Sequence, residues 1–291
     1  MTVLVPTSLD EAIAGLAAND GATLLAGGTD LMVEVNEGHR HFPWPDGGAT
    51  VIALHRVPEL SSWTYDVPVA TVVLGAGVTW TTVEQSPLRE LVPALAEAAR
   101  TVGSPQIRHA GTVGGNLATC SPAGDGLPVL AALDAVVSLV SAGGRRTMPV
   151  REFMIGVKRT ALQPGELIES ITVPVLQGWQ GYSKVGVRNA MVIATASACV
   201  ATDVPNRSIR IALGSVAPTV VRCPDAEAFA VEHVDWDALA VDADDAVEFG
   251  RLAAAASRPI DDHRSTAAYR RHAVAVMAQR LLQRAFPGGG R

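Results

Sequence analysis

Cysteine is scarce in this 291-residue sequence, and the chemistry that depends on cysteine is therefore excluded. The three cysteines, Cys120, Cys199 and Cys223, have no C-x-x-C spacing, so they predict neither a disulfide framework nor a zinc or iron–sulfur cage. The seven histidines show no ligand spacing either. We therefore predict no metal in this chain, and the cysteine usage favours a reducing, cytoplasmic location.

Excess basic charge and long apolar runs are also missing. The formal net charge is −6, with 23 Lys and Arg against 29 Asp and Glu, which leaves no basic field for a nucleic-acid backbone. The longest apolar stretches, residues 127–140 and 190–201, are too short or too interrupted to cross a bilayer, and residues 1–6 do not resemble a signal peptide. We expect no nucleic-acid partner and no membrane span.

Several familiar active-site patterns are absent as well. No segment matches the phosphate-binding pattern G-x4-G-K-[S/T], and Gly75-Ala76-Gly77 lacks the third glycine of a nicotinamide fingerprint. We find no Ser-His-Asp, paired-carboxylate or Cys-His constellation. The sequence therefore predicts no catalytic side chain of its own.

Two glycine pairs stand out among the residues that are present. Gly27-Gly28 and Gly114-Gly115 are far apart in the chain, and small or hydroxylic residues flank both. Glycine lets the backbone approach a ligand closely and adopt positive φ, so several N–H groups can converge on a phosphate. Either pair alone is explained by a turn, but together they predict the two walls of a diphosphate site. Hydroxyl and amide groups nearby come from Thr29, Thr112, Asn116 and Ser121.

The periodicity of residues 1–177 mixes helices with strands and hairpins. Ser8 and Glu11 form a capping box for a first helix, and a short buried strand at residues 22–26 leads directly into Gly27-Gly28. Further helical segments are predicted at residues 31–35, 81–100 and 127–133, a loop at 39–48, and strands at 69–76, 135–141, 146–150 and 168–173.

A linker rich in Pro, Gly and Gln at residues 174–181 predicts a domain boundary near residue 177. Residues 1–177 then divide into subdomains of about 1–55 and 56–177, and residues 178–291 form a C-terminal domain. That domain is predicted to contain strands at 182–187, 192–202 and 208–215, then helices at 225–231, 244–256 and 265–284. The fold class is α+β. We interpret Arg270-Arg271-His272 on the last helix as a solvated or inter-subunit face.

Two segments carry a resemblance to a known family. They are LLAGGTDLM at residues 24–32 and QIRHAGTVGGNLATCSPAGDGLP at residues 106–128. The chain resembles, from residue 1 to about 285, the FAD-binding medium subunit of molybdenum hydroxylases, which includes the carbon monoxide dehydrogenase flavoprotein and the FAD domain of xanthine dehydrogenase. The resemblance implies a p-cresol methylhydroxylase-type domain of two subdomains clasping FAD, followed by a three-stranded sheet with helices.

The resemblance also implies roles for individual residues. Residues 24–31 wrap the pyrophosphate and flavin, residues 112–116 supply opposing amides, and Asp125 holds a sugar hydroxyl. Leu162 packs on adenine, and Val102 replaces an aromatic ring beside the flavin. From the residues themselves, Asp125 can also cap the helix that follows, and we interpret Cys120 as a small residue packed by the cofactor rather than a nucleophile or a flavin attachment. The expected cofactor-binding residues are Leu24, Leu25, Ala26, Gly27, Gly28, Thr29, Asp30, Leu31, Val102, Thr112, Val113, Gly114, Gly115, Asn116, Ser121, Asp125, Leu162, Tyr182 and Lys184.

Tyr182 and Lys184 are included because they lie on the first strand after the linker. The resemblance implies that this strand places a lysine near the cofactor and an aromatic residue near the isoalloxazine. The sequence departs from the family at Met191-Val192-Ile193-Ala194, where xanthine dehydrogenases carry acidic residues. This departure and Val102 argue against NAD as electron acceptor and favour a quinone, another carrier or oxygen.

The implied function is electron transfer within a molybdenum dehydrogenase. A small subunit with 2Fe-2S clusters and a large subunit with the molybdenum cofactor would complete the enzyme, as a dimer of heterotrimers, and the substrate would bind on another chain. Two alternatives are a self-contained FAD-dependent oxidoreductase of the same superfold and an interaction protein that has lost its cofactor. The intact glycine motifs argue against the latter.

Overall fold

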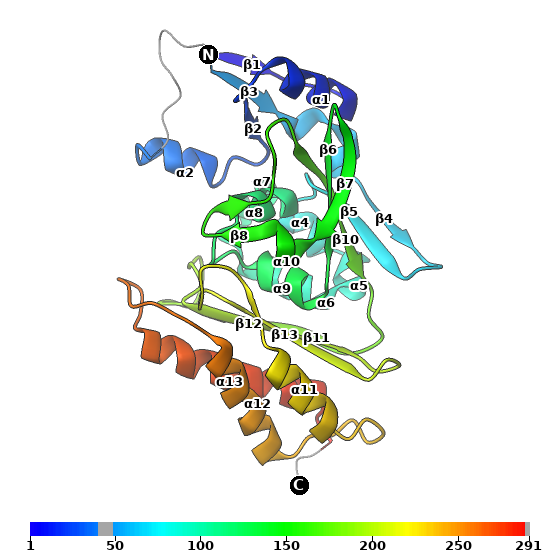
Figure 1. The fold of residues 1–291 in the computed structure, drawn as a ribbon, viewed down its shortest axis with the longest axis vertical. Helices are drawn as coiled ribbons and strands as arrows, with labels where there is room; N and C mark the ends of the chain where they lie inside the picture. Colours follow the sequence, from blue (N-terminus) through cyan, green and yellow to red (C-terminus); the bar gives the residue numbers. More distant parts are fainter. Residues whose placement is uncertain (40–48, 289–291) are drawn as a thin grey trace.

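A small parallel sheet begins the chain in the computed structural model, which describes residues 1–39 and 49–288 (Figure 1). Its strands are β1 (Thr2–Leu4), β2 (Thr23–Leu25) and β3 (Thr50–Ala53), in the order β1-β3-β2. Helix α1 (Leu9–Ala18) begins where Ser8 accepts from the N–H of Glu11, as predicted. The carboxylate of Glu11 reaches back one residue further than a capping box requires, to the N–H of Thr7 at 2.7 Å.

The first glycine pair lies at the end of β2, between that strand and α2 (Leu31–Asn36). Both elements agree with the predicted strand and helical turn. The predicted loop at residues 39–48 lies, apart from its first residue, outside the described residues.

The middle of the molecule is an antiparallel five-stranded sheet of β4 (Trp63–Asp66), β5 (Thr71–Gly75), β10 (Leu167–Pro174), β6 (Val136–Ser141) and β7 (Gly144–Pro149), in that order. The predicted hairpin of β6 and β7 is confirmed, with Ser141 opposite Gly144. Short elements lie between strands: η1 (Leu54–Arg56) and α3 (Pro58–Ser61) between β3 and β4, and α10 (Val150–Phe153), β8 (Met154–Gly156) and β9 (Arg159–Thr160) between β7 and β10.

Several short helices pack beside this sheet. The segment predicted to be helical from residue 81 to 100 is divided into α4 (Trp80–Val83), α5 (Leu88–Leu91) and α6 (Pro93–Thr101). Pro87 and Pro93 account for the division, since proline cannot donate the hydrogen bond that continues a helix. The remaining helices are α7 (Pro105–Ala110), α8 (Val113–Thr119) and α9 (Gly126–Ala132), the last of which was predicted.

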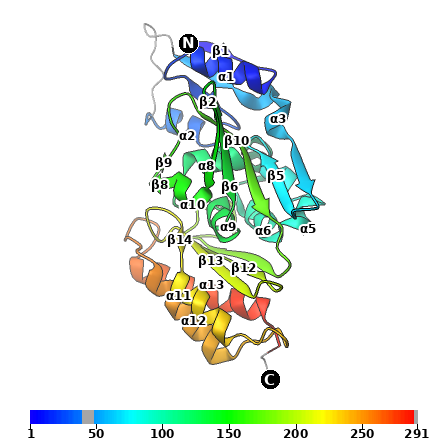
Figure 2. The ribbon, with the colours of Figure 1, turned by 45° about the vertical axis from the view of Figure 1, so that its right-hand side comes forward.

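The C-terminal part contains the predicted antiparallel meander of β11 (Gln180–Val185), β12 (Ala196–Asp203) and β13 (Ser208–Gly214). A two-residue strand, β14 (Val221–Arg222), adds an edge that the sequence pattern did not indicate. Helices α11 (Pro224–His233), α12 (Ala243–Ala256) and α13 (Ala267–Ala285) cover one face of this sheet (Figures 1 and 2). In the described part of the chain, no helix is long and apolar enough to cross a membrane.

Strand β12 is buried on both faces. Cys199 and Ala201 belong to the hydrophobic core that also contains Leu127 of α9, whereas Ala198 and Val200 belong to the core beneath α12 and α13. A strand covered on both faces is apolar throughout rather than alternating, which accounts for the apolar run at residues 196–201 but not for residues 190–193 before it, where Met191 and Ile193 are exposed. The sheet is therefore the layer that joins the two cores.

Arg270 corrects the expectation of a solvated face on the last helix. Its side chain is buried, and its guanidinium donates to the carbonyl oxygens of Thr195 and Ser215, each at 2.8 Å, and to Asp262 at 2.7 Å. These bonds satisfy carbonyl groups at the ends of β12 and β13 that lie away from water. The neighbouring Arg271 and His272 are exposed, as expected.

The burial of Arg270 generates a stability prediction. Replacing it in Arg270→Met leaves two buried carbonyls without a donor and removes one of the donors to Asp262, so the free energy of unfolding should fall by about 2–4 kcal/mol. The matched change Arg271→Met on the exposed face should alter it by less than about 0.5 kcal/mol. Urea unfolding of both variants checks this, and equal midpoints would contradict the structural role of Arg270.

Candidate functional site

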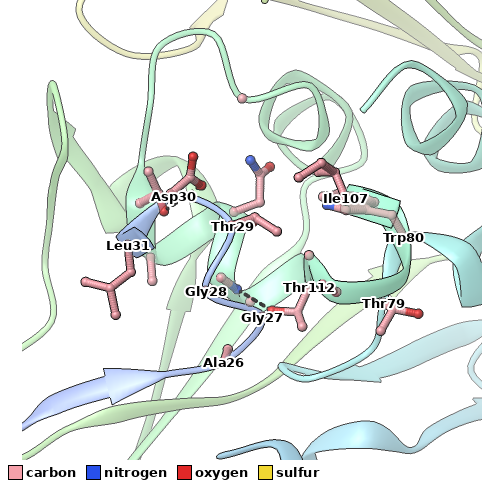
Figure 3. A pocket seen from close by; sticks show the side chains of 18 of the residues that line it. Ala26, Gly27, Gly28, Thr29, Asp30, Leu31, Thr79, Trp80, Ile107 and Thr112 are labelled. Carbon is pink, nitrogen blue, oxygen red and sulfur yellow. Dashed lines mark hydrogen bonds between the residues drawn. The ribbon is translucent and has the colours of Figure 1, made fainter. Parts of the chain in front are cut away.

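The two glycine segments lie on one cleft of about 920 Å³. Figure 3 shows Asp30 and Leu31 on one side of it and Trp80 and Ile107 on the other, with Gly27, Gly28 and Thr112 between them. A Cβ on Gly27 would lie 1.8 Å from the carbonyl oxygen of Ala110 and 3.0 Å from Cα of Gly111. The two walls thus touch through their backbones.

The first wall offers hydrogen-bond donors to the cleft. Among the described residues, the N–H groups of Gly27, Gly28 and Thr29 donate to no protein acceptor, and Gly28 adopts φ +71°. Consecutive free N–H groups in a bend with positive φ form the concave arrangement that binds phosphate oxygens. This wall matches the prediction made for a diphosphate site.

The second wall was predicted to offer backbone N–H groups to the phosphates, but the N–H groups of residues 113–116 donate to acceptors within the protein. The N–H groups of Val113 and Gly114 donate to the carbonyls of Val78 and Ala76, each at 2.9 Å. The hydroxyl of Thr112 accepts from the N–H of Gly115 at 2.9 Å, as drawn in Figure 3, and the Thr112 carbonyl accepts from Asn116. Gly114 is required here by close packing, since its Cβ would lie 2.5 Å from that of Ala76.

Asn116 supplies the polar group that the second wall presents. Its Oδ1 is buried and has no hydrogen-bond partner in the described part of the chain. The side chain faces Gly124 and Gly126, whose added Cβ atoms would lie 3.0 and 3.1 Å from its amide atoms. A buried amide oxygen without a partner in a cleft wall indicates a ligand that donates to it.

The described residues of the cleft therefore fit a bound dinucleotide. Free N–H groups suit the phosphates, the amide of Asn116 and the carboxylate of Asp125 suit hydroxyl donors, and Val102 and Leu162 suit flat rings. The cleft is lined by sixteen of the predicted residues, which are Leu24, Leu25, Ala26, Gly27, Gly28, Thr29, Asp30, Leu31, Val102, Thr112, Gly114, Gly115, Asn116, Ser121, Asp125 and Leu162.

Three predicted residues do not line the cleft. Val113 is fully buried in the hydrophobic core, because α8 turns that side chain inward. Lys184 donates to Asp125 at 2.7 Å and to the carbonyl of Thr101 at 2.8 Å. Tyr182 is buried and donates its hydroxyl to Asp125 at 2.8 Å, so it contacts a residue of the cleft wall rather than the cleft.

The same contacts correct the expectation that Asp125 caps a helix. Asp125 has helical dihedrals, φ −62° and ψ −33°, and makes no capping hydrogen bond to α9. Its two oxygens each accept one hydrogen bond, from Tyr182 and from Lys184, instead. Burial raises the pKa of Asp125, and the Lys184 ammonium together with the hydrogen bonds opposes that rise.

Cys120 also lies elsewhere than expected. It ends α8 with φ +47°, and its thiol is 3.6 Å from the carbonyl oxygen of Gly156 in β8, outside the cleft lining. Burial raises the pKa of this thiol, which makes it a poor nucleophile. Its role is packing beneath the β8–β9 hairpin.

Sequence reasoning missed part of the wall formed by Thr79 and Trp80. Both follow Gly75-Ala76-Gly77, the segment considered only as an incomplete nicotinamide fingerprint. Gly75 and Gly77 are glycines because Leu60 approaches them, its carbonyl oxygen lying 2.3 and 3.0 Å from their added Cβ atoms. The glycines at 75 and 77, interpreted as positions of close backbone packing, were the sequence signal that could have found this wall. Other cleft residues not predicted include His55, Ile107, His109, Lys158, Met191, Val192 and Ile193.

The α+β fold holds a glycine-lined cleft suited to a dinucleotide, as in proteins that bind a nucleotide cofactor. Residues 1–176 match the family described as FAD binding domain in molybdopterin dehydrogenase, and residues 182–285 match the CO dehydrogenase flavoprotein C-terminal domain. The chain belongs to this family of FAD-binding oxidoreductase subunits.

Individual relatives agree with this assignment. The carbon monoxide dehydrogenase medium chain of Hydrogenophaga pseudoflava is 32% identical over 295 residues, covering 97% of this chain and 95% of that relative. The nicotinate dehydrogenase FAD-subunit of Eubacterium barkeri is 35% identical over 192 residues, covering 64% of this chain and 62% of the relative. A solved structure of Cu,Mo-CO dehydrogenase matches with a TM-score of 0.87 and 28% identity, covering 99% of this chain and 98% of that one.

The contact between the two walls generates a binding prediction. In Gly27→Ala the new methyl group collides with the Ala110 carbonyl and forces the walls apart, so FAD affinity should fall by roughly tenfold or more. Titration of the FAD-free chain with FAD, followed by flavin fluorescence, measures this. The control Gly15→Ala places its methyl group at 3.5 Å from Leu4, an ordinary contact, and should bind FAD normally. Wild-type affinity in Gly27→Ala would contradict the prediction.

Proposed function

We propose that this chain is the electron-transfer subunit of a molybdenum dehydrogenase, which accepts electrons from iron–sulfur clusters of a partner and passes them to an external acceptor. The observation that carries the proposal is the cleft, which is lined by both the free N–H groups of residues 27–29 and the buried amide of Asn116. Bound FAD supplies the redox chemistry, and the protein binds and orients it.

The names of the relatives support a multi-subunit enzyme. They include medium chains and an alpha subunit of a 6-hydroxypseudooxynicotine dehydrogenase complex from Paenarthrobacter nicotinovorans, 28% identical over 290 residues. We therefore propose a small subunit with 2Fe-2S clusters and a large subunit with the molybdenum cofactor as partners, arranged as a dimer of heterotrimers. Within residues 1–39 and 49–288, no group of three His, Cys, Asp or Glu is placed to hold a metal ion.

The acceptor is proposed to differ from NAD. Val102 and the segment Met191-Val192-Ile193 line the cleft with uncharged side chains at the two positions where the sequence departs from xanthine dehydrogenases. A quinone, another carrier or oxygen fits these uncharged side chains better than a positively charged nicotinamide ring. We further propose a cytoplasmic location, where the free cysteines Cys120, Cys199 and Cys223 stay reduced, and a domain boundary near residue 177.

Purification of the native complex tests the proposed function. Capture through this chain under native conditions should yield FAD, iron and molybdenum in the same fractions, because the three redox groups belong to one assembly. Removing FAD from the complex should abolish delivery of electrons to the acceptor while metal content stays unchanged. Recovery of a flavoprotein without either metal, or full-rate oxidation of a small organic substrate by the isolated chain, would refute the proposal.

A further inference from the structure

At Asp125 the C-terminal sheet contacts a carboxylate of the cleft wall and engages both of its oxygens. Oδ1 accepts from the hydroxyl of Tyr182 at 2.8 Å and Oδ2 from the ammonium of Lys184 at 2.7 Å. Both donors come from β11, outside the cleft lining. We propose that Tyr182 is a positioning residue of the FAD site, which acts through Asp125 by holding its carboxylate toward a hydroxyl of the cofactor. The proposal rests on the FAD-binding role of the cleft and extends it to the C-terminal domain.

Tyr182 is well fixed for this role. Its N–H donates to Glu97 of α6 at 2.7 Å, and it pairs with Cys199 of β12 in the sheet. The side chain is only 6% exposed, so the phenol has little freedom to turn away. Burial raises the pKa of Tyr182 well above its ordinary value, which keeps the hydroxyl protonated and able to donate.

Lys184 alone does not fix the orientation of the carboxylate. Its ammonium is shared between Asp125 and the carbonyl of Thr101 at the C-terminal end of α6. It therefore supplies charge at one oxygen, whereas the hydroxyl of Tyr182 fixes the other. Each oxygen retains capacity to accept a further hydrogen bond, so Asp125 can still accept from a hydroxyl in the cleft.

A second set of contacts joins the C-terminal sheet to α9, through β13 and β14. Asp134, which follows α9, accepts from Arg222 of β14 at 2.7 Å and from Arg210 of β13 at 3.2 Å. Arg222 also donates to the carbonyl of Ala131 in α9 at 3.1 Å. The sheet that carries Tyr182 is thus anchored at the far end of the helix that begins beside Asp125.

The positioning role has a pH signature. The groups that face Asp125 and Tyr182 are Lys184 of β11, Thr101 and Glu97 of α6, and Cys199 of β12, with Arg284 of α13 within 3.7 Å of Glu97. Removing the phenol hydroxyl removes a donor that favours the ionised carboxylate, so burial then raises the pKa of Asp125 further. FAD should consequently dissociate from the variant at a higher pH during acid titration than from the wild type.

The test measures FAD dissociation constants of the full-length chain across pH for Tyr182→Phe, Asp125→Asn and the double variant. Tyr182→Phe should weaken FAD binding about tenfold, because a carboxylate no longer fixed at Oδ1 makes a poorer hydrogen bond to the cofactor hydroxyl. The double variant should bind no more weakly than Asp125→Asn, because Tyr182 acts only through that carboxylate. Tyr269→Phe, an exposed tyrosine of α13, is the matched control and should keep wild-type affinity and pH profile.

Two results would overturn the positioning role. Additive losses in the double variant, or wild-type affinity and an unshifted pH profile in Tyr182→Phe, would show that Tyr182 does not act through Asp125. In both cases the wild-type chain still binds FAD, so the proposed function would stand. A wild-type chain that bound no FAD would overturn both proposals. Asp125→Asn preserves volume, and its own loss of affinity tests the carboxylate even if Tyr182→Phe folds poorly.

Discussion

The contact between Gly27 and the Ala110–Gly111 backbone is the constraint on which the site depends. No side chain fits between the two walls, because an added Cβ would lie 1.8 Å from a carbonyl oxygen. This contact brings the free N–H groups of the first wall and the buried amide of Asn116 into one cleft. The cleft is thus defined by backbone approach, which explains why glycines rather than charged side chains mark it in the sequence.

Much of the architecture could be predicted because it follows from local patterns. The capped first helix, the β6–β7 hairpin and the three-stranded meander all show the periodicity and turn residues of their class. Local sequence patterns do not predict an element or the burial of a side chain when these depend on contacts with residues distant in the sequence. Strand β14 is only two residues long and exists because β13 pairs with it, and Arg270 is buried because two strand ends present carbonyls to it.

The candidate site likewise has one part that the sequence predicts and another that depends on contacts between distant residues. The glycine walls could be predicted because close approach needs glycine, and sixteen of the expected residues line the cleft. The pairing of Asp125 with Tyr182 and Lys184 could not, since it joins the start of α9 to a strand of the other core. Their assignment as cofactor contacts came from the resemblance alone, and hydrogen-bond geometry places both behind the wall.

Because β12 is buried on both faces, the two domains depend on each other for stability. Cys199 and Ala201 face one hydrophobic core, whereas Ala198 and Val200 face the other, so each core is closed on one side by the same strand. Dividing the polypeptide before this sheet would expose an apolar surface on each of the two domains, because the sheet contributes to both hydrophobic cores. A recombination event that separated the two domains would therefore need new side chains or a partner to cover the exposed apolar face of β12.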